Sequence, residues 1–279
     1  MLLRDYQTDI IAKLRHSLAA GHKRPVIQAP TGSGKTIIAA SIVRMARAKG
    51  NRVMFCVPAI ELIDQTVERF ARNGILEVGV IQANHELTDY SQPVQVCSVQ
   101  TLSRRDIPMA DLVIIDECHR GGANDESNWR GIMEYFKPAV QLGLTATPKR
   151  QENADTYRYF GEPVFIYSLK DGINDGFLTP FKVKQIATTL DEYVYTPDDQ
   201  LIEGEIEAKK RYTESDFNKI IEIKEREKKR VEIFMGQINQ QEKTLVFCAT
   251  QDHALAVRDL INQIKMSPDP NYCQRVTAN

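Results

Sequence analysis

The stretch APTGSGKT, Ala29–Thr36, decides the interpretation of this chain. An apolar, strand-like run precedes it and helical spacing follows it, the setting of a glycine-rich phosphate-binding loop. Backbone N–H groups of this loop would line a concavity at a helix N-terminus, which favours phosphate oxygens. Those N–H groups belong to Thr31, Gly32, Ser33, Gly34 and Lys35. Lys35 would neutralise the outer phosphates and Thr36 would place its hydroxyl on Mg²⁺, so the loop predicts a site for a nucleoside triphosphate.

Strand-like and helix-like patterns alternate around this loop, from residue 25 to about residue 148. Six short runs rich in Val, Ile and Leu predict strands: Pro25–Ala29, Arg52–Val57, Val78–Gln82, Val94–Val99, Asp111–Asp116 and Val140–Thr145. Most of these runs are continuously apolar, which is typical of strands covered on both faces. A helical stripe over Thr36–Lys49 joins the first two. The pattern predicts the α/β class, with a parallel sheet built from βαβ units.

The second chemical motif is LVIIDECHR, Leu112–Arg120, in which an apolar run ends in two acids. Asp116 and Glu117 would lie at the carboxyl end of a strand, the edge where parallel sheets bind ligands. There Asp116 would hold Mg²⁺, usually through water, and Glu117 would orient and deprotonate an attacking water. The alternative is a pair of solvated acids at a strand end, which the nearby phosphate loop disfavours.

Composition limits the classes of protein to consider. The chain has 279 residues and a net charge of −1, so its overall charge does not indicate binding to a polyanion. This weighs against a protein that coats DNA, but not against a motor that must release it repeatedly. Five cysteines without a CxxC pair fit a reducing cytoplasm. No apolar run approaches the roughly 20 residues that span a bilayer, and the N-terminus lacks signal-peptide features.

Two further matches carry a family resemblance. Asp116-Glu117-Cys118-His119 and Leu144-Thr145-Ala146-Thr147-Pro148 follow the phosphate loop in the order found in superfamily 2 helicases of the DEAD/DEAH kind, which the chain resembles. The resemblance implies a RecA-like P-loop ATPase lobe. It also implies a catalytic role for His119, which in the family couples the γ-phosphate site to the motif that here contains Thr145 and Thr147.

Weaker matches concern the base and the nucleic acid. The segment around Arg4 and Gln7 resembles the family's adenine-reading motif, which makes ATP the expected nucleotide. Val57–Gln65 and Ser98–Leu102 resemble two motifs that lie along the nucleic-acid backbone in relatives. The residues expected to make these backbone contacts are Pro58, Ala59, Gln100 and Thr101. The alternative for each segment is an ordinary strand-to-helix junction.

Beyond Pro148 the pattern changes. We predict a first helicase lobe over residues 1–165, edge strands and a linker over 166–215, and the beginning of an incomplete second lobe over 216–279. Helical spacing spans Phe217–Gln240 around the charged run Lys224–Arg230, which we interpret as a solvated helix face. The apolar run Thr244–Thr250 predicts a strand, and a helix-like stretch follows it.

The second half also narrows the family resemblance. Arg158–Ile186 and the stretches from Arg211 and Lys243 resemble the motor portion of the R subunit of type I restriction enzymes. That resemblance implies ATP-driven movement on duplex DNA and partner subunits of a restriction-modification system. The family's nuclease domain precedes the motor, and no such segment precedes Leu2, so we expect no DNA cleavage by this chain alone. The family's arginines that assist hydrolysis lie beyond Asn279, so we expect Mg·ATP binding with weak hydrolysis.

Two other functions stay open at this point. An RNA-remodelling DEAD-type ATPase shares the phosphate loop and the acidic strand end, although His119 disfavours it; stimulation of ATPase activity by duplex DNA or by RNA would discriminate. A non-enzymatic module that uses ATP as a conformational switch would show no stimulation by any nucleic acid.

Overall fold

A computed structural model of the chain describes residues 3–82, 84–102, 107–120, 126–148, 156–184, 192–194, 201–203, 211–213 and 222–277. The chain divides into two compact units, residues 1–181 and 182–279. Compactness does not by itself identify a helicase lobe. The boundaries expected at residues 165 and 215 therefore stay predictions.

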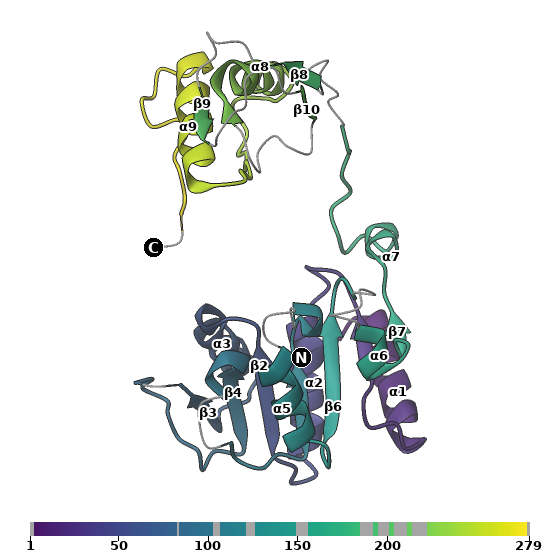
Figure 1. Ribbon diagram of the computed structural model, residues 1–279. Helices are drawn as coiled ribbons and strands as arrows, with labels where there is room; N and C mark the ends of the chain where they lie inside the picture. Colours follow the sequence, from purple (N-terminus) through teal and green to yellow (C-terminus); the bar gives the residue numbers. More distant parts are fainter. Residues whose placement is uncertain are drawn as a thin grey trace. The chain divides into compact units, whose positions relative to one another are not determined.

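The first unit is built on a seven-stranded sheet whose strands are all parallel (Figure 1). Its order is β3-β4-β2-β5-β6-β1-β7. The strands are β1 (Val26–Gln28), β2 (Val53–Val57), β3 (Val78–Ile81), β4 (Val94–Ser98), β5 (Leu112–Ile115), β6 (Val140–Thr145) and β7 (Phe165–Ile166). The six strands expected from the sequence are confirmed, and β7 is an additional edge strand. The predicted α/β class with a parallel sheet is confirmed.

Helices cover both faces of this sheet. They are α1 (Asp5–Ala19), α2 (Lys35–Arg47), α3 (Ile63–Arg72), α4 (Val99–Leu102), α5 (Glu126–Tyr135), α6 (Thr156–Phe160) and α7 (Leu169–Asn174), with 3-10 turns η1 (Ile60–Leu62) and η2 (Cys118–Arg120). Along β2, Phe55 packs with residues of α1, α2 and α3, whereas its neighbours Met54 and Cys56 pack with residues of α4 and α5. Burial on both faces explains why the strands are continuously apolar. No helix in the described part of the chain has the length and apolar character needed to cross a bilayer.

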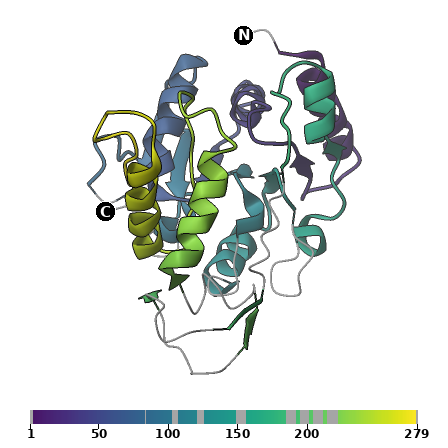
Figure 2. The same cartoon turned by 90° about the horizontal axis from the view of Figure 1, so that it is seen from above.

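The second unit is small. Antiparallel pairs join β8 (Glu192–Val194) to β10 (Arg211–Thr213) and β9 (Leu201–Glu203) to β11 (Glu222–Ile223). Helices α8 (Lys224–Met235) and α9 (Gln251–Ile264) lie side by side in both views (Figure 1, Figure 2). Their seam buries Val231, Met235, Val257, Leu260 and Ile261.

In the described part of the second unit, one predicted strand is absent and one predicted helix is present in part. The strand predicted over Thr244–Thr250 is wrong: residues 243–248 form no strand, and the side chains of Leu245 and Phe247 are 73% and 87% exposed. An apolar run becomes a strand only when a neighbouring strand pairs with it, and no described strand does so here. Part of the predicted helix Phe217–Gln240 is confirmed as α8, and residues 217–221 lie outside the described ranges. The prediction is wrong at Glu222 and Ile223, which form β11, and beyond Met235, where the helix ends.

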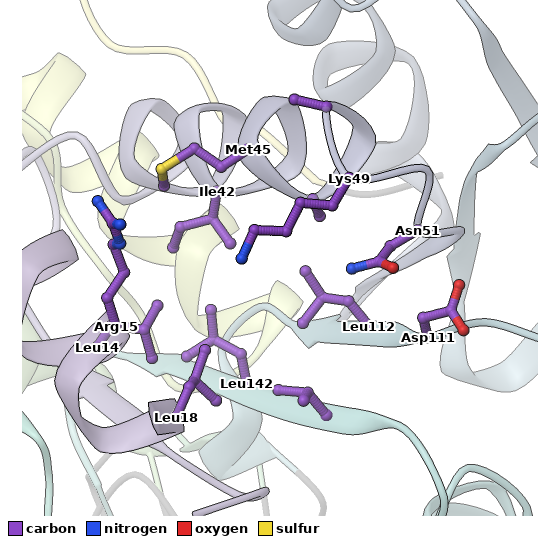
Figure 3. Close-up of a pocket in the computed structure, with 13 residues that line it drawn as sticks. Leu14, Arg15, Leu18, Ile42, Met45, Lys49, Asn51, Asp111, Leu112 and Leu142 are labelled. Atoms are coloured by element: carbon purple, nitrogen blue, oxygen red, sulfur yellow. The ribbon is translucent and has the colours of Figure 1, made fainter. Parts of the chain in front are cut away.

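A pocket of about 340 Å³ lies near the amino ends of β5 and β6 (Figure 3). Leu14 and Leu18 of α1, Ile42 of α2 and Leu142 of β6 form part of its apolar lining, and the amino group of Lys49 points toward them. The phosphate loop follows the carboxyl end of β1, so this pocket is at the other edge of the sheet.

Candidate nucleotide-binding site

The phosphate loop leaves β1 and enters α2, as its sequence predicts. Gly34 is the N-cap of α2 and has φ +81°, a left-handed conformation that glycine adopts without strain. A Cβ atom at this position would lie 2.8 Å from Nε2 of Gln7. Ser33 is buried, Thr31 is exposed, and Lys35 and Thr36 begin the helix. The loop therefore presents its N–H groups at a helix N-terminus, as anion binding requires.

Side chains of α1 hold this loop through hydrogen bonds to its backbone. Nε2 of Gln7 donates to the carbonyl oxygen of Ser33 at 3.2 Å, and the Tyr6 hydroxyl donates to the same oxygen. Oε1 of Gln7 accepts from the backbone N–H of Arg4 at 3.1 Å. The side chain of Gln7 is only 2% exposed, so its amide holds the loop in this structure. The direct reading of adenine by Arg4 and Gln7 stays a prediction.

Phe177 is a neighbour that the sequence did not indicate. The guanidinium of Arg4 lies 4.3 Å from the centroid of the Phe177 ring, a cation–π distance. The Phe177 ring also contacts Tyr6, which stacks on Tyr167 with ring centroids 4.0 Å apart. An exposed aromatic ring and a cation thus stand beside the helix that holds the phosphate loop.

The acidic strand end meets the loop at the same edge of the sheet. Nζ of Lys35 lies 3.1 Å from Oε1 of Glu117 and donates to the carbonyl oxygen of Ala29 at 3.3 Å. The side chains of Lys35 and Glu117 are 11% and 20% exposed. Glu117 has φ +48°, a conformation that costs a non-glycine residue about 1–3 kcal/mol and that is enriched at functional sites. The structure thus brings together the lysine and the acid that the sequence placed in one site.

The surroundings of Asp116 change the pKa of its carboxyl group. Burial and the negative charge of Glu117 raise the pKa of Asp116, and the charge of Lys35 partly offsets the rise. Oε2 of Glu117 is buried without a hydrogen-bond partner among the described residues, although Nδ1 of His119 lies 3.4 Å away. A buried carboxylate oxygen without a donor is costly, unless a further ligand or water binds there.

His119 connects the acidic motif to the end of β6. Its Nδ1 lies 2.8 Å from Oγ1 of Thr145, and its Nε2 lies 3.3 Å from Oγ1 of Thr147. Oγ1 of Thr145 also accepts from the backbone N–H of Thr147 at 3.1 Å. Because β6 lies between β5 and β1, these groups adjoin both the acids and the phosphate loop. The three motifs therefore form one connected set of polar side chains.

Arg69 of α3 also reaches the site, and no motif in the sequence indicated it. Its Nη1 donates to Oγ1 of Thr36 at 3.1 Å. Its positive charge also lowers the pKa of Asp116, as a smaller effect than burial. Only the folding of α3 beside α2 brings this arginine to the loop.

The residues expected to contact nucleic acid also lie at this edge. Pro58 and Ala59 follow β2, and Gln100 and Thr101 lie in α4, directly after β4. Strands β2 and β4 are neighbours, so the two segments leave the sheet side by side. The Thr101 hydroxyl is 2.8 Å from the Ser98 hydroxyl. Contact with a nucleic-acid backbone stays a prediction for all four residues.

Comparison with known proteins agrees with this fold. The family model described as "Type III restriction enzyme, res subunit" matches residues 1–150. A curated relative from Escherichia coli, "Type I restriction enzyme EcoAI endonuclease subunit", is 31% identical over 298 aligned positions, which cover 99% of this chain and 36% of the relative. This chain thus spans little more than a third of the length of that relative.

Solved structures point in the same direction. A fragment structure assigned to an HsdR subunit of a type I restriction enzyme from Vibrio vulnificus YJ016 has a TM-score of 0.66 and 30% identity, covering 94% of this chain and 45% of that one. The Hef helicase domain of Pyrococcus furiosus has a TM-score of 0.52 and 18% identity over 94% of this chain and 54% of that one, which shows the fold alone. The family model covers more than half of the chain, so the chain belongs to the type III restriction enzyme res subunit family, with a superfamily 2 helicase fold that resembles the type I restriction R subunit.

Proposed function

We propose that this chain is the ATP-binding part of a DNA translocase or helicase, and that ATP hydrolysis at the site above drives movement on duplex DNA. The observation that carries the proposal is the 3.1 Å contact between Nζ of Lys35 and Oε1 of Glu117. It joins the phosphate loop to the acidic strand end, the two parts that a P-loop ATPase needs in one place. The buried Oε2 of Glu117 is the acceptor such a site requires.

The residues present fit Mg²⁺ and ATP. The loop N–H groups and Lys35 would hold the phosphates, and the Thr36 hydroxyl and Asp116 would hold the ion, Asp116 through water. Bound Mg²⁺ would supply charge neutralisation across the outer phosphates. Arg4 would hold the base, and the exposed ring of Phe177 adjoins Arg4. Gln7 would join it only by giving up the hydrogen bond from its amide to the carbonyl oxygen of Ser33.

Each side chain then has a definable task. Lys35 would balance negative charge on the phosphates, and its amino group lies 3.1 Å from Oε1 of Glu117. Once Lys35 turns to the phosphates, Glu117 can orient a water and take its proton. His119 contacts both Thr145 and Thr147, so a change around Glu117 can reach the end of β6.

The choice of DNA rests on the relatives. Both the Escherichia coli relative and the Vibrio vulnificus structure are named as subunits of type I restriction enzymes. We therefore propose duplex DNA, held by its backbone at Pro58, Ala59, Gln100 and Thr101, and further subunits of a restriction-modification system as partners. The proposal places the protein in the cytoplasm, where the free thiols would stay reduced.

Two substitutions test the hydrolytic site. Glu117→Gln removes the base but keeps the size of the side chain, so we expect hydrolysis to fall by about 10²–10⁴-fold with nucleotide binding retained. Lys35→Ala should weaken binding itself. Single-turnover hydrolysis of labelled ATP and titration with a fluorescent ATP analogue separate the two effects.

The nature of the track needs a separate comparison. We expect duplex DNA to stimulate ATP turnover more than RNA of equal length does. Stronger stimulation by RNA would favour an RNA-remodelling ATPase, and stimulation by neither would favour a nucleotide-switched module. Normal turnover in Glu117→Gln would show that the base is misassigned.

A further inference from the structure

Arg69 contacts the residue proposed as a metal ligand. Its Nη1 donates to Oγ1 of Thr36 at 3.1 Å, although the arginine lies on α3 and the threonine on α2. Phe70, the next residue, is fully buried and packs edge-on against Phe55 of β2 with ring centroids 5.1 Å apart. This packing fixes α3 on the sheet and keeps the base of the Arg69 side chain beside the phosphate loop.

The contact between Arg69 and Thr36 places a positive charge at a hydroxyl oxygen that is proposed to bind a metal ion. A guanidinium keeps its positive charge at every physiological pH and acts only as a donor. While Arg69 donates to Oγ1 of Thr36, one lone pair of that oxygen is used and a positive charge stands next to it. A divalent cation at the same oxygen would be repelled by that charge. Arg69 and Mg²⁺ would therefore compete for the hydroxyl oxygen of Thr36. This competition rests on the function proposed above.

The other end of α3 belongs to the segment expected to contact nucleic acid. Helix α3 begins at Ile63, and the segment Val57–Gln65 runs into its first turn. The same helix thus carries Arg69 at the phosphate loop and, in its first turn, the end of the segment whose residues Pro58 and Ala59 are predicted to contact nucleic acid. A change in the contact between Arg69 and Thr36 could therefore move α3, which extends from the phosphate loop to the segment predicted to contact nucleic acid.

We propose that Arg69 is a positioning residue for the Thr36 hydroxyl, and that Arg69 and bound Mg²⁺-nucleotide compete for that oxygen atom. Binding of the metal thereby changes the surroundings of α3. The competition predicts how the charge of Arg69 affects nucleotide affinity with and without Mg²⁺. Removal of the positive charge favours nucleotide bound with Mg²⁺, and it disfavours metal-free nucleotide, whose phosphates lose an attractive neighbour.

The test is a titration of the whole chain with a fluorescent ADP analogue, once with Mg²⁺ and once with EDTA. The quantity of interest is the ratio of the two affinities. Arg69→Gln keeps a donor but loses the charge, and we expect the ratio to rise roughly fivefold or more. Arg69→Lys restores the charge and should return the ratio toward that of the wild type. Arg72→Gln is the matched control, because Arg72 is an exposed cation of the same helix that pairs with Glu68.

Hydrogen exchange of the α3 amides supplies a second measurement. Addition of Mg²⁺ and ADP should change exchange in the wild type and in Arg72→Gln, with a smaller change in Arg69→Gln. A purely structural role would shift both affinities together and leave their ratio unchanged, which would overturn this inference while leaving the proposed function intact. Absence of ADP binding by the wild type, with Lys35→Ala indistinguishable from it, would overturn both.

Discussion

Replacement of Gly34 by alanine would disturb the phosphate loop in two separable ways. The first is conformational, because Gly34 has φ +81° and a Cβ atom is strained there. The second is steric, because that Cβ would lie 2.8 Å from Nε2 of Gln7. Gln7 is 2% exposed and donates to Ser33, so it cannot move aside without breaking the hydrogen bond that fastens the loop.

The two costs can be given magnitudes. A left-handed conformation costs an alanine about 1–2 kcal/mol. A buried donor left without its acceptor costs about 1–3 kcal/mol. We therefore expect Gly34→Ala to lower the free energy of unfolding by about 2–5 kcal/mol. Nucleotide affinity should fall as well, because the displaced loop no longer presents its N–H groups to the phosphates.

Gly50→Ala is the matched control for this experiment. Gly50 has φ +80°, but no atom of the described residues lies within 4 Å of the point where an alanine Cβ would stand, so only the conformational cost applies. Urea unfolding of both variants should show an excess cost of about 1–3 kcal/mol for Gly34→Ala. In a Gln7→Ala background that excess should disappear. Equal destabilisation by Gly34→Ala and Gly50→Ala would refute the reasoning.

Two further predictions concern the acids and the end of β6. Asp116→Asn should raise the free energy of unfolding at pH 7, because burial raises the pKa of Asp116 and makes its ionised form costly in the folded state. The gain should shrink as the pH falls and the wild-type carboxyl takes up its proton; urea unfolding across pH measures this, and a gain that grows toward acid would contradict it. Thr145→Val should cost about 0.5–1.5 kcal/mol, because the hydrogen bond from the N–H of the exposed Thr147 is lost. It should also uncouple DNA from ATP turnover while sparing ADP affinity, and unchanged DNA stimulation would count against the role of His119.

Much of the first unit was predictable because the burial of each strand is visible in its own residues. A strand covered on both faces must be apolar throughout, so Arg52–Val57 and Val140–Thr145 stood out in the sequence and match β2 and β6. The carboxyl end of β5 placed Asp116 and Glu117 at the ligand edge by the same logic. Strand order and the edge strand β7 were not predicted, because they depend on which strands pair after folding.

The parts of the site that the sequence did not indicate arise from tertiary contacts. Arg69 has no motif of its own and reaches Thr36 only because α3 packs beside α2. Gln7 was expected to face a base, and its contact with the carbonyl of Ser33 depends on how α1 lies behind the loop. The run Thr244–Thr250 was predicted as a strand that the structure does not contain. Its apolar residues show that the segment could pair with a strand, but not that a partner strand lies beside it.

The central claim is that the phosphate loop and the acidic strand end bind one Mg²⁺-nucleotide together. Calorimetric titration with a non-hydrolysable ATP analogue, with Mg²⁺ and with EDTA, tests it most directly. The account predicts one nucleotide per chain, weaker binding in EDTA, and loss of that metal dependence in Asp116→Ala, while Lys35→Ala weakens binding in both conditions. Binding that neither substitution alters would contradict it.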